Sequence, residues 1–233
     1  MKEYIKTSAH KALNNSNELY LLSGSIPVYI INKLPVKINF NNVIKTLEKH
    51  IPAPILNMIE GIYIGEFDEL KTRNIQAMFK DGVIYLSSFQ NNPNVSEKLI
   101  TKDICHELGH ALEDNLGKEI YADGKIENED NGKKQKLFSL LAHEGYHFAK
   151  EILFDDRLIE YLDDLLYKEI GYDKLSLIIP GLFMSPYSIT SIREYFANGL
   201  EDYLLGDQKH LKKMCSALYN KINSICDEMR FSA

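Results

Sequence analysis

The chain has 233 residues, of which 45% are hydrophobic and 26% are charged. This mixture excludes a disordered polypeptide and is typical of a globular protein. The formal net charge is −6 and no basic stripe is interleaved with aromatic residues, which argues against nucleic-acid binding. No apolar run approaches the ~18 residues that a membrane span needs, so we expect no membrane segment.

Three cysteines occur, with no short paired spacing: Cys105, Cys215 and Cys226. An odd, sparse set argues against a disulfide framework and against a cysteine-rich zinc site. The first twenty residues contain no apolar core of a signal peptide. Together these features predict a cytoplasmic or virion-associated protein.

The N-terminal third alternates strand-like runs with a short helix. Residues 1–25 are polar and indicate a helix or loop, whereas 28–31 and 36–40 are β-branched and apolar and predict strands. A helix is expected over 43–50, after two asparagines that suit an N-cap. A further strand is expected over 62–67.

A hairpin is the clearest local signal in this part of the chain. Residues 75–79 and 83–87 have strand-like sequences, and Asp81-Gly82 between them favours a tight turn. We therefore expect residues 26–88 to form a small, mainly antiparallel sheet.

From residue 94 onward the pattern is helical. Apolar residues recur at three- and four-residue steps along 99–112. Further helices are predicted over 134–154, 158–169, 191–205 and 210–229. The expected fold is α+β, a single domain spanning 1–233 in which the sheet packs on a larger helical lobe.

Residues 106–110, at the middle of the first long helix, read H-E-L-G-H. Residues four apart lie on one helical face, so His106 and His110 can converge on one Zn²⁺ ion. Glu107 lies one step round the helix, where it can take a proton from a zinc-bound water. The motif predicts a zinc-dependent peptide hydrolase.

A second H-E-x-x-H is formed by His143, Glu144 and His147. The first motif is favoured for two reasons. A strand precedes it, at which an extended substrate could add by backbone hydrogen bonds through Val83, Ile84, Tyr85 and Leu86. The second motif carries a glycine inside its helix, which costs roughly 1 kcal/mol relative to alanine.

A catalytic zinc ion needs a third protein ligand. A metzincin would have Gly at position 113 and His at 116, but this chain has Glu113 and Leu116. A thermolysin-like arrangement would use Glu127 or Glu129, in a stretch whose sequence predicts a solvated turn. Glu194 is the better candidate, because it lies beside the apolar side of a predicted helix, where a carboxylate is costly unless it is paired or bound to metal. A salt bridge from Glu194 to a lysine is the alternative.

These residues resemble a known family. Residues 106–114, H-E-L-G-H-A-L-E-D, and 194–197, E-Y-F-A, are similar to the catalytic domain of anthrax lethal factor and the related Pro-Pro endopeptidases. The resemblance covers roughly 75–206 and implies a zincin-like fold with Glu194 as the third zinc ligand. It also implies that Tyr187 donates a hydrogen bond to the tetrahedral intermediate and that the second H-E-x-x-H is scaffold.

Two features lie outside the resemblance. About forty additional residues, 148–185, precede Tyr187; these could restrict the cleft, bind a protein partner or simply pack. Asp114, one turn beyond His110, is a candidate for orienting an imidazole from the second shell, and a solvent-facing helix charge is the alternative. No role is assigned to 1–70, and 207–233 is expected to be a C-terminal helix.

The expected function is zinc-dependent endopeptidase activity on a peptide or protein substrate. The alternative is a catalytically silent structural or interaction protein on the same fold, for example a virion or toxin component. All five chemical positions are intact, and this favours the enzyme: His106, Glu107, His110, Tyr187 and Glu194.

Overall fold

A computed structural model of the chain describes residues 18–90 and 92–231. The fold is α+β, as predicted. The chain divides into two compact units, the first within 1–115 and 229–233 and the second Leu116–Glu228. This division does not follow the boundaries expected from the sequence, because it falls inside the helix that carries the first H-E-x-x-H.

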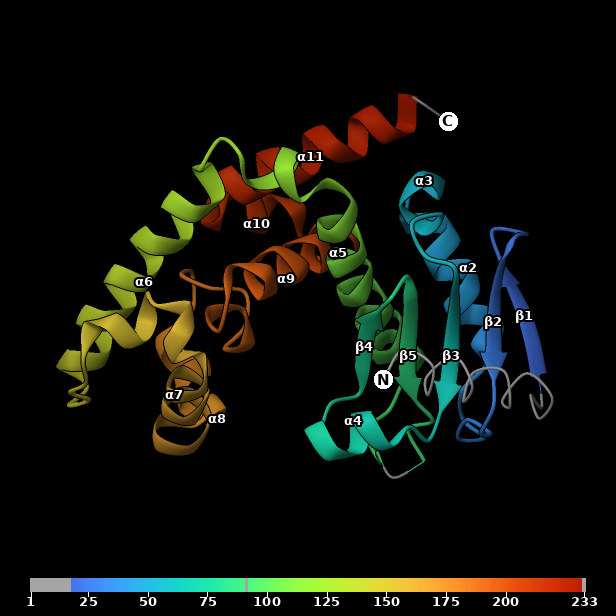
Figure 1. Cartoon of the computed structure of the whole chain (residues 1–233), viewed down its shortest axis with the longest axis horizontal. Coiled ribbons are helices and arrows are strands. Elements are labelled where there is room, and N and C mark those ends of the chain that lie inside the picture. Colours follow the sequence, from blue (N-terminus) through green and yellow to red (C-terminus); the bar gives the residue numbers. More distant parts are fainter. Residues whose placement is uncertain (1–17, 91, 232–233) are drawn as a thin grey trace. The chain divides into compact units, whose positions relative to one another are not determined.

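The first unit contains a five-stranded sheet (Figure 1). Its strands are β1 (Glu18–Leu22), β2 (Ile26–Ile30), β3 (Gly61–Gly65), β4 (Ala77–Lys80) and β5 (Val83–Ser87), in the order β1-β2-β3-β5-β4. The β1–β2 and β4–β5 pairs are antiparallel, whereas β2–β3 and β3–β5 are parallel. The sheet is therefore mixed, and the expectation of a mainly antiparallel sheet was wrong.

The parallel pairs follow from the connections between the strands. Helices α2 (Phe40–His50) and α3 (Ala53–Leu56) lie between β2 and β3, and α4 (Asp68–Arg73) follows β3. Such helical crossovers return the chain to the same end of the sheet, as parallel pairing requires. Pairing of this kind has no local sequence signal comparable to a hairpin turn.

Two of the elements expected in the N-terminal third differ in the structure, whereas the strands over 28–31 and 62–67, the helix over 43–50 and the hairpin are confirmed. The strand expected at 36–40 is absent, because the Asn39 side chain accepts the Asn41 N–H and starts α2 at Phe40. Residues 18–22, expected as helix or loop, form β1; residues 1–17 lie outside the described part. The Asp81-Gly82 hairpin is present, with φ of 50° and 82° at its two turn residues, as a type I′ turn requires.

Alternation along the strands gives the sheet two different faces. One face carries fully or almost fully buried aliphatic residues from the three central strands: Val28, Ile30, Ile62, Ile64, Ile84 and Leu86. The opposite face carries tyrosines in register, with ring centroids 5.0 Å apart for Tyr29–Tyr63 and 5.8 Å for Tyr63–Tyr85. The aliphatic face forms part of the core of this unit.

Helix α5 (Glu97–Tyr121) belongs to both units and is interrupted at Leu116, where φ is −125° and ψ is 19°. The second unit is helical throughout its described elements. They are α6 (Lys125–His143), η1 (Lys150–Leu153), η2 (Asp156–Leu158), α7 (Ile159–Asp164), the π-helical η3 (Leu165–Ile170), α8 (Tyr172–Ile178), η4 (Tyr187–Ile189), α9 (Ile192–Leu205), α10 (Gln208–Met214) and α11 (Ser216–Phe231).

Helix α6 corrects the predicted solvated turn around residue 129. Its charged residues are held by contacts inside the second unit: Lys134 pairs with Asp130 at 2.9 Å, and Lys133 donates to the carbonyls of Leu182 and Met214. In the described part of the chain, no helix is long and apolar enough to cross a membrane.

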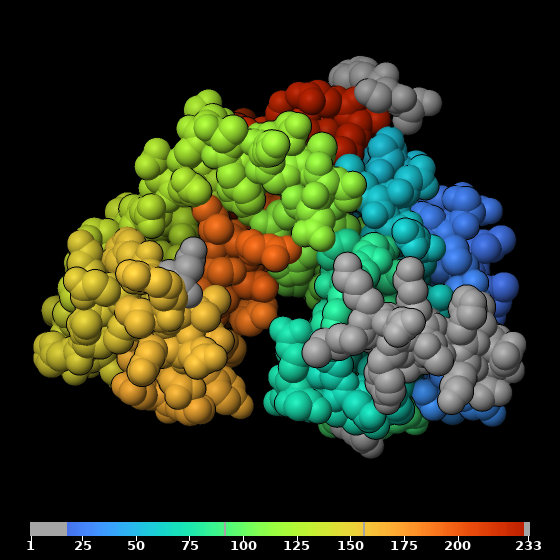
Figure 2. Space-filling model, in the orientation of Figure 1, coloured from blue at the N-terminus to red at the C-terminus, as the bar shows by residue number. Residues whose placement is uncertain are grey.

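The segment 148–185 folds as short helical pieces of the second unit. Figure 2 shows part of it, coloured yellow, at the molecular surface. Several large hydrophobic side chains are exposed on it: Ile159, Tyr161, Tyr167 and Leu177. The helical content expected for these additional residues is confirmed.

Candidate metal centre

The start of α5 fixes the direction of the helix that carries the motif. The Glu97 carboxylate accepts the Asn39 N–H at 2.9 Å, and Ser96 Oγ accepts the Leu99 N–H at 3.2 Å. The apolar face of the helix is buried: Ile100, Ile104, Leu108, Ala111 and Leu112. Because these residues set the rotation of the helix, they also fix where residues 106, 107 and 110 point.

His106 and His110 lie next to each other on α5, one turn apart. Their ring centroids are 5.0 Å apart and their planes make an angle of 84°. Both residues are half-buried. The prediction that the two imidazoles share one helical face is confirmed, and this separation is compatible with two ligands of a single ion.

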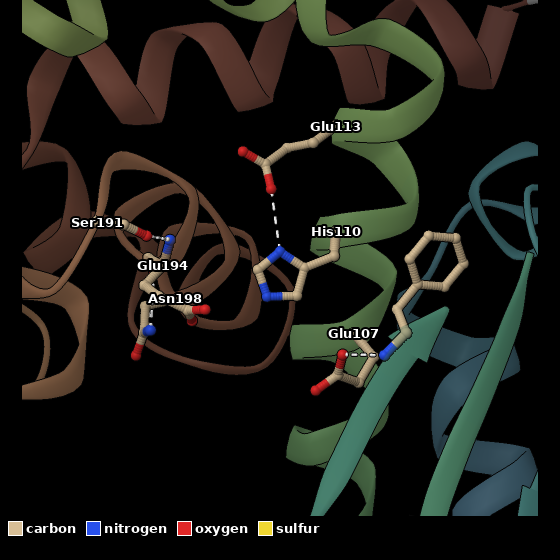
Figure 3. A network of polar contacts seen from close by, with 7 residues as sticks. Glu107, His110, Glu113, Ser191, Glu194 and Asn198 are labelled. Carbon is tan, nitrogen blue, oxygen red and sulfur yellow. Dashed lines mark hydrogen bonds and ion pairs between the residues drawn. The ribbon is translucent and has the colours of Figure 1, made fainter. Parts of the chain in front are cut away.

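Glu107 is held against the sheet of the same unit. Its side chain is buried, with 6% exposure, and its Oε2 accepts the backbone N–H of Phe79 in β4 at 2.6 Å (Figure 3). A buried carboxylate needs such a partner. The hydrogen bond also ties the glutamate of the motif to the edge strand of the sheet.

His110 has a carboxylate partner within its own helix. Its Nδ1 lies 3.0 Å from Oε2 of Glu113, three residues later (Figure 3). The sequence analysis had named Asp114 for contact with an imidazole, but Asp114 is exposed and the contact at His110 is made by Glu113. Both residues follow the motif within one turn, so spacing alone did not distinguish them. The exposure of Asp114 favours the alternative stated for it, a solvent-facing helix charge.

Glu194 lies in the first turn of α9, in the second unit. The Ser191 side chain caps this helix by accepting the Glu194 N–H at 3.1 Å, and Asn198 Nδ2 donates to the Glu194 carbonyl at 2.9 Å (Figure 3). The residue is half-buried. A carboxylate in the first turn interacts favourably with the partial positive charge of the helix N-terminus.

The added segment lies near Glu194 within the second unit. Burial raises the pKa of Asp163 first, and the negative charges of Asp164 and Glu194 raise it further. The pKa of Tyr172 is raised by burial, then by Asp163 and Glu194. The segment 148–185 therefore contributes to the electrostatic surroundings of the candidate ligand.

Tyr187 is on η4, shortly before α9. It is 43% exposed, and its carbonyl accepts the Thr190 hydroxyl at 2.9 Å, which holds the turn that leads into α9. The position is compatible with a phenol that meets a substrate, and its role in the chemistry stays a prediction.

The predicted substrate strand needs correction. Residues Val83–Leu86 belong to β5, which is paired with β3 on one side and with β4 on the other. Its backbone groups are therefore used by the sheet, and no edge is left for an added peptide. The edge next to α5 is β4, the strand whose Phe79 N–H reaches Glu107.

The second H-E-x-x-H does not lie on a helical face. Helix α6 ends at His143, Gly145 has a φ of 91°, and His143, Glu144 and His147 are all exposed. The i, i+4 geometry that would bring two imidazoles together is therefore absent. The assignment of the second motif to the scaffold stays a prediction.

Glu127 and Glu129, the residues considered for a thermolysin-like third ligand, both lie in α6. Glu129 accepts hydrogen bonds from the Tyr195 hydroxyl at 3.0 Å and from the N–H groups of Ala217 and Leu218 at 2.8 and 3.1 Å. It thereby caps the start of α11, a structural role within the second unit. Glu127 lies in the first turn of α6.

No protein-family model, curated protein or solved structure matches this chain. The resemblance to the lethal factor family and the zincin-like assignment therefore stay predictions that rest on the motif residues.

Proposed function

We propose that this protein is a zinc-dependent peptide hydrolase. The observation that carries the proposal is the arrangement on α5: two imidazoles on one helical face, and a buried carboxylate next to the first of them in sequence that is hydrogen-bonded to the edge strand. A metal-activated water and an extended peptide need these features side by side.

The donor set fits zinc. Among the described residues, the side chains that could together hold a metal ion are His106, His110 and Glu194. Two imidazoles and one carboxylate form a common ligand set of catalytic zinc and leave one coordination position open. We propose that these three side chains are the protein ligands of the ion.

The protein side chains would then have separate tasks. The zinc ion that His106, His110 and Glu194 would hold would act as a Lewis acid toward the scissile carbonyl and a water. Glu107 takes the proton of that water and passes it to the leaving amine. Tyr187 donates a hydrogen bond to the developing oxyanion, an interaction of a kind worth about 3–4 kcal/mol in other enzymes.

We propose that the substrate binds in an extended conformation along β4. This strand is the edge of the sheet, and its Phe79 N–H contacts Glu107. A peptide added there would pass the carboxylate that performs the proton transfer. The specificity of the enzyme is expected to depend in part on segment 148–185, which lies near Glu194 in the second unit.

The exposed hydrophobic side chains of segment 148–185 favour a second candidate, a protein that uses this fold to bind a partner without cleaving it. This candidate predicts no need for Glu107. The enzyme is preferred because Glu107 is buried and anchored beside the two imidazoles.

Metal analysis and peptide cleavage test the proposal together. The full chain should contain one zinc ion, which His106→Ala loses and His143→Ala retains. Glu107→Ala should keep its zinc and lose cleavage of a broad peptide library. The proposal fails if wild-type protein cleaves no peptide of the library, or if His143→Ala loses the metal and His106→Ala does not.

A further inference from the structure

We infer that Glu113 is a positioning residue that holds His110 in the tautomer and ring orientation needed to bind zinc. The inference rests on the proposed function. It starts from the 3.0 Å contact between His110 Nδ1 and Glu113 Oε2 within α5 (Figure 3).

The contact determines which nitrogen can bind metal. A neutral imidazole has one N–H donor and one nitrogen lone pair. An ionised carboxylate can only accept, so Nδ1 must carry the proton that it donates to Glu113. The lone pair is then on Nε2, and the ring is prevented from turning away by a hydrogen bond inside its own helix.

Glu113 is buried, and a buried carboxylate needs a partner. Three acidic residues of the described part are buried as whole residues: Glu107, Glu113 and Asp130. Asp130 pairs with Lys134, and Glu107 accepts the N–H of Phe79. Glu113 directly follows two fully buried apolar residues of α5, and its Oε2 lies 3.0 Å from the His110 ring. Its carboxylate is explained by the imidazole that it contacts.

Asp114 provides a matched control. It has the same charge, lies on the same helix and is the next residue, but it is exposed, whereas the Glu113 side chain is 4% exposed and His110 is 14% exposed. An effect that comes only from the net negative charge of the helix would be shared by both residues. An effect that comes from fixing His110 belongs to Glu113.

The test compares Glu113→Gln with Asp114→Asn in the full chain. Zinc dissociation constants are measured by competition with a chromophoric chelator. Glu113→Gln should weaken zinc binding by about 10–100-fold, the usual effect of losing such a partner, and Asp114→Asn should leave it within twofold. The visible spectrum of cobalt-substituted protein should change in Glu113→Gln alone, because it reports ligand geometry.

Two further measurements distinguish an effect on the His110 ring from an effect on folding. The thermal transition of the zinc-free protein should be similar in both variants, and Glu113→Asp, which retains the charge, should bind zinc better than Glu113→Gln. Unchanged zinc affinity and an unchanged cobalt spectrum in Glu113→Gln would overturn this inference alone. A wild-type protein that binds no zinc would overturn the proposed function as well.

Discussion

Tyr85 is a buried tyrosine whose ionisation is altered by the fold. It closes the row of stacked tyrosines on β2, β3 and β5 and also meets Phe67 edge-on at 5.3 Å. Burial raises the pKa of Tyr85 to about 12, and the nearby Tyr63, Asp81 and Glu69 add smaller contributions. The folded state therefore keeps a proton that the unfolded chain loses near pH 10.

This difference predicts a loss of stability at alkaline pH. Between about pH 10 and pH 12 the unfolded state binds fewer protons than the folded state, so the free energy of unfolding falls as pH rises. Tyr85→Phe removes this contribution and should make the decline shallower. Urea denaturation at pH 9, 10 and 11 measures it, with Tyr167→Phe as an exposed control. Equal slopes for Tyr85→Phe and wild type would contradict the assignment.

Several residues of the candidate centre could be found from the sequence because their signals are local. The i, i+4 spacing of His106 and His110 fixes their relation on any helix. The partner of His110 could not be chosen, since Glu113 and Asp114 are adjacent and only burial separates them. The choice of substrate strand failed for a related reason: whether β4 or β5 is the edge depends on pairing with β3, a contact distant in sequence.

At the scale of elements, the packing of α9 on α11 leaves no space for a side chain at Gly199. A Cβ atom built there would lie 2.8 Å from Cγ of Leu218, a fully buried residue of α11. Gly132, at an exposed position of α6, has no heavy atom within 4 Å of a Cβ atom placed in the same way. The two glycines therefore differ only in what surrounds them.

Alanine substitutions at the two positions should have opposite effects. Gly199→Ala is expected to destabilise the protein by about 1–3 kcal/mol, because the added methyl group overpacks the contact with Leu218. Gly132→Ala should stabilise it by about 0.5–1 kcal/mol through helix propensity alone. Chemical denaturation measures both changes. Stabilisation of similar size in both variants would show that α9 and α11 are not this close.

The elements themselves were predictable to different degrees. The Asp81-Gly82 hairpin and α9 were recovered because turn residues, caps and apolar periodicity act over a few residues. The first half of α6 was missed, because its charged sequence suggests a solvated turn and its helix is supported by distant partners, such as the α11 backbone groups bound by Glu129. The parallel strand pairs were missed because crossover pairing is decided by tertiary structure.

At the scale of the whole molecule, the proposed zinc ligands come from stretches that are far apart in the sequence. His106 and His110 lie within 1–115, and Glu194 lies within Leu116–Glu228. The proposal requires all three side chains. The activity then depends on the full chain, and a variant that lacks the Glu194 carboxylate should resemble one that lacks a histidine.

An anomalous difference map, recorded at the zinc absorption edge from crystals of the full chain, tests the central claim most directly. We expect one peak, about 2.0–2.2 Å from a ring nitrogen of His106, from Nε2 of His110 and from a carboxylate oxygen of Glu194. A peak at His143 and His147 would contradict the account. So would a zinc ion on the α5 histidines whose third protein ligand is not Glu194.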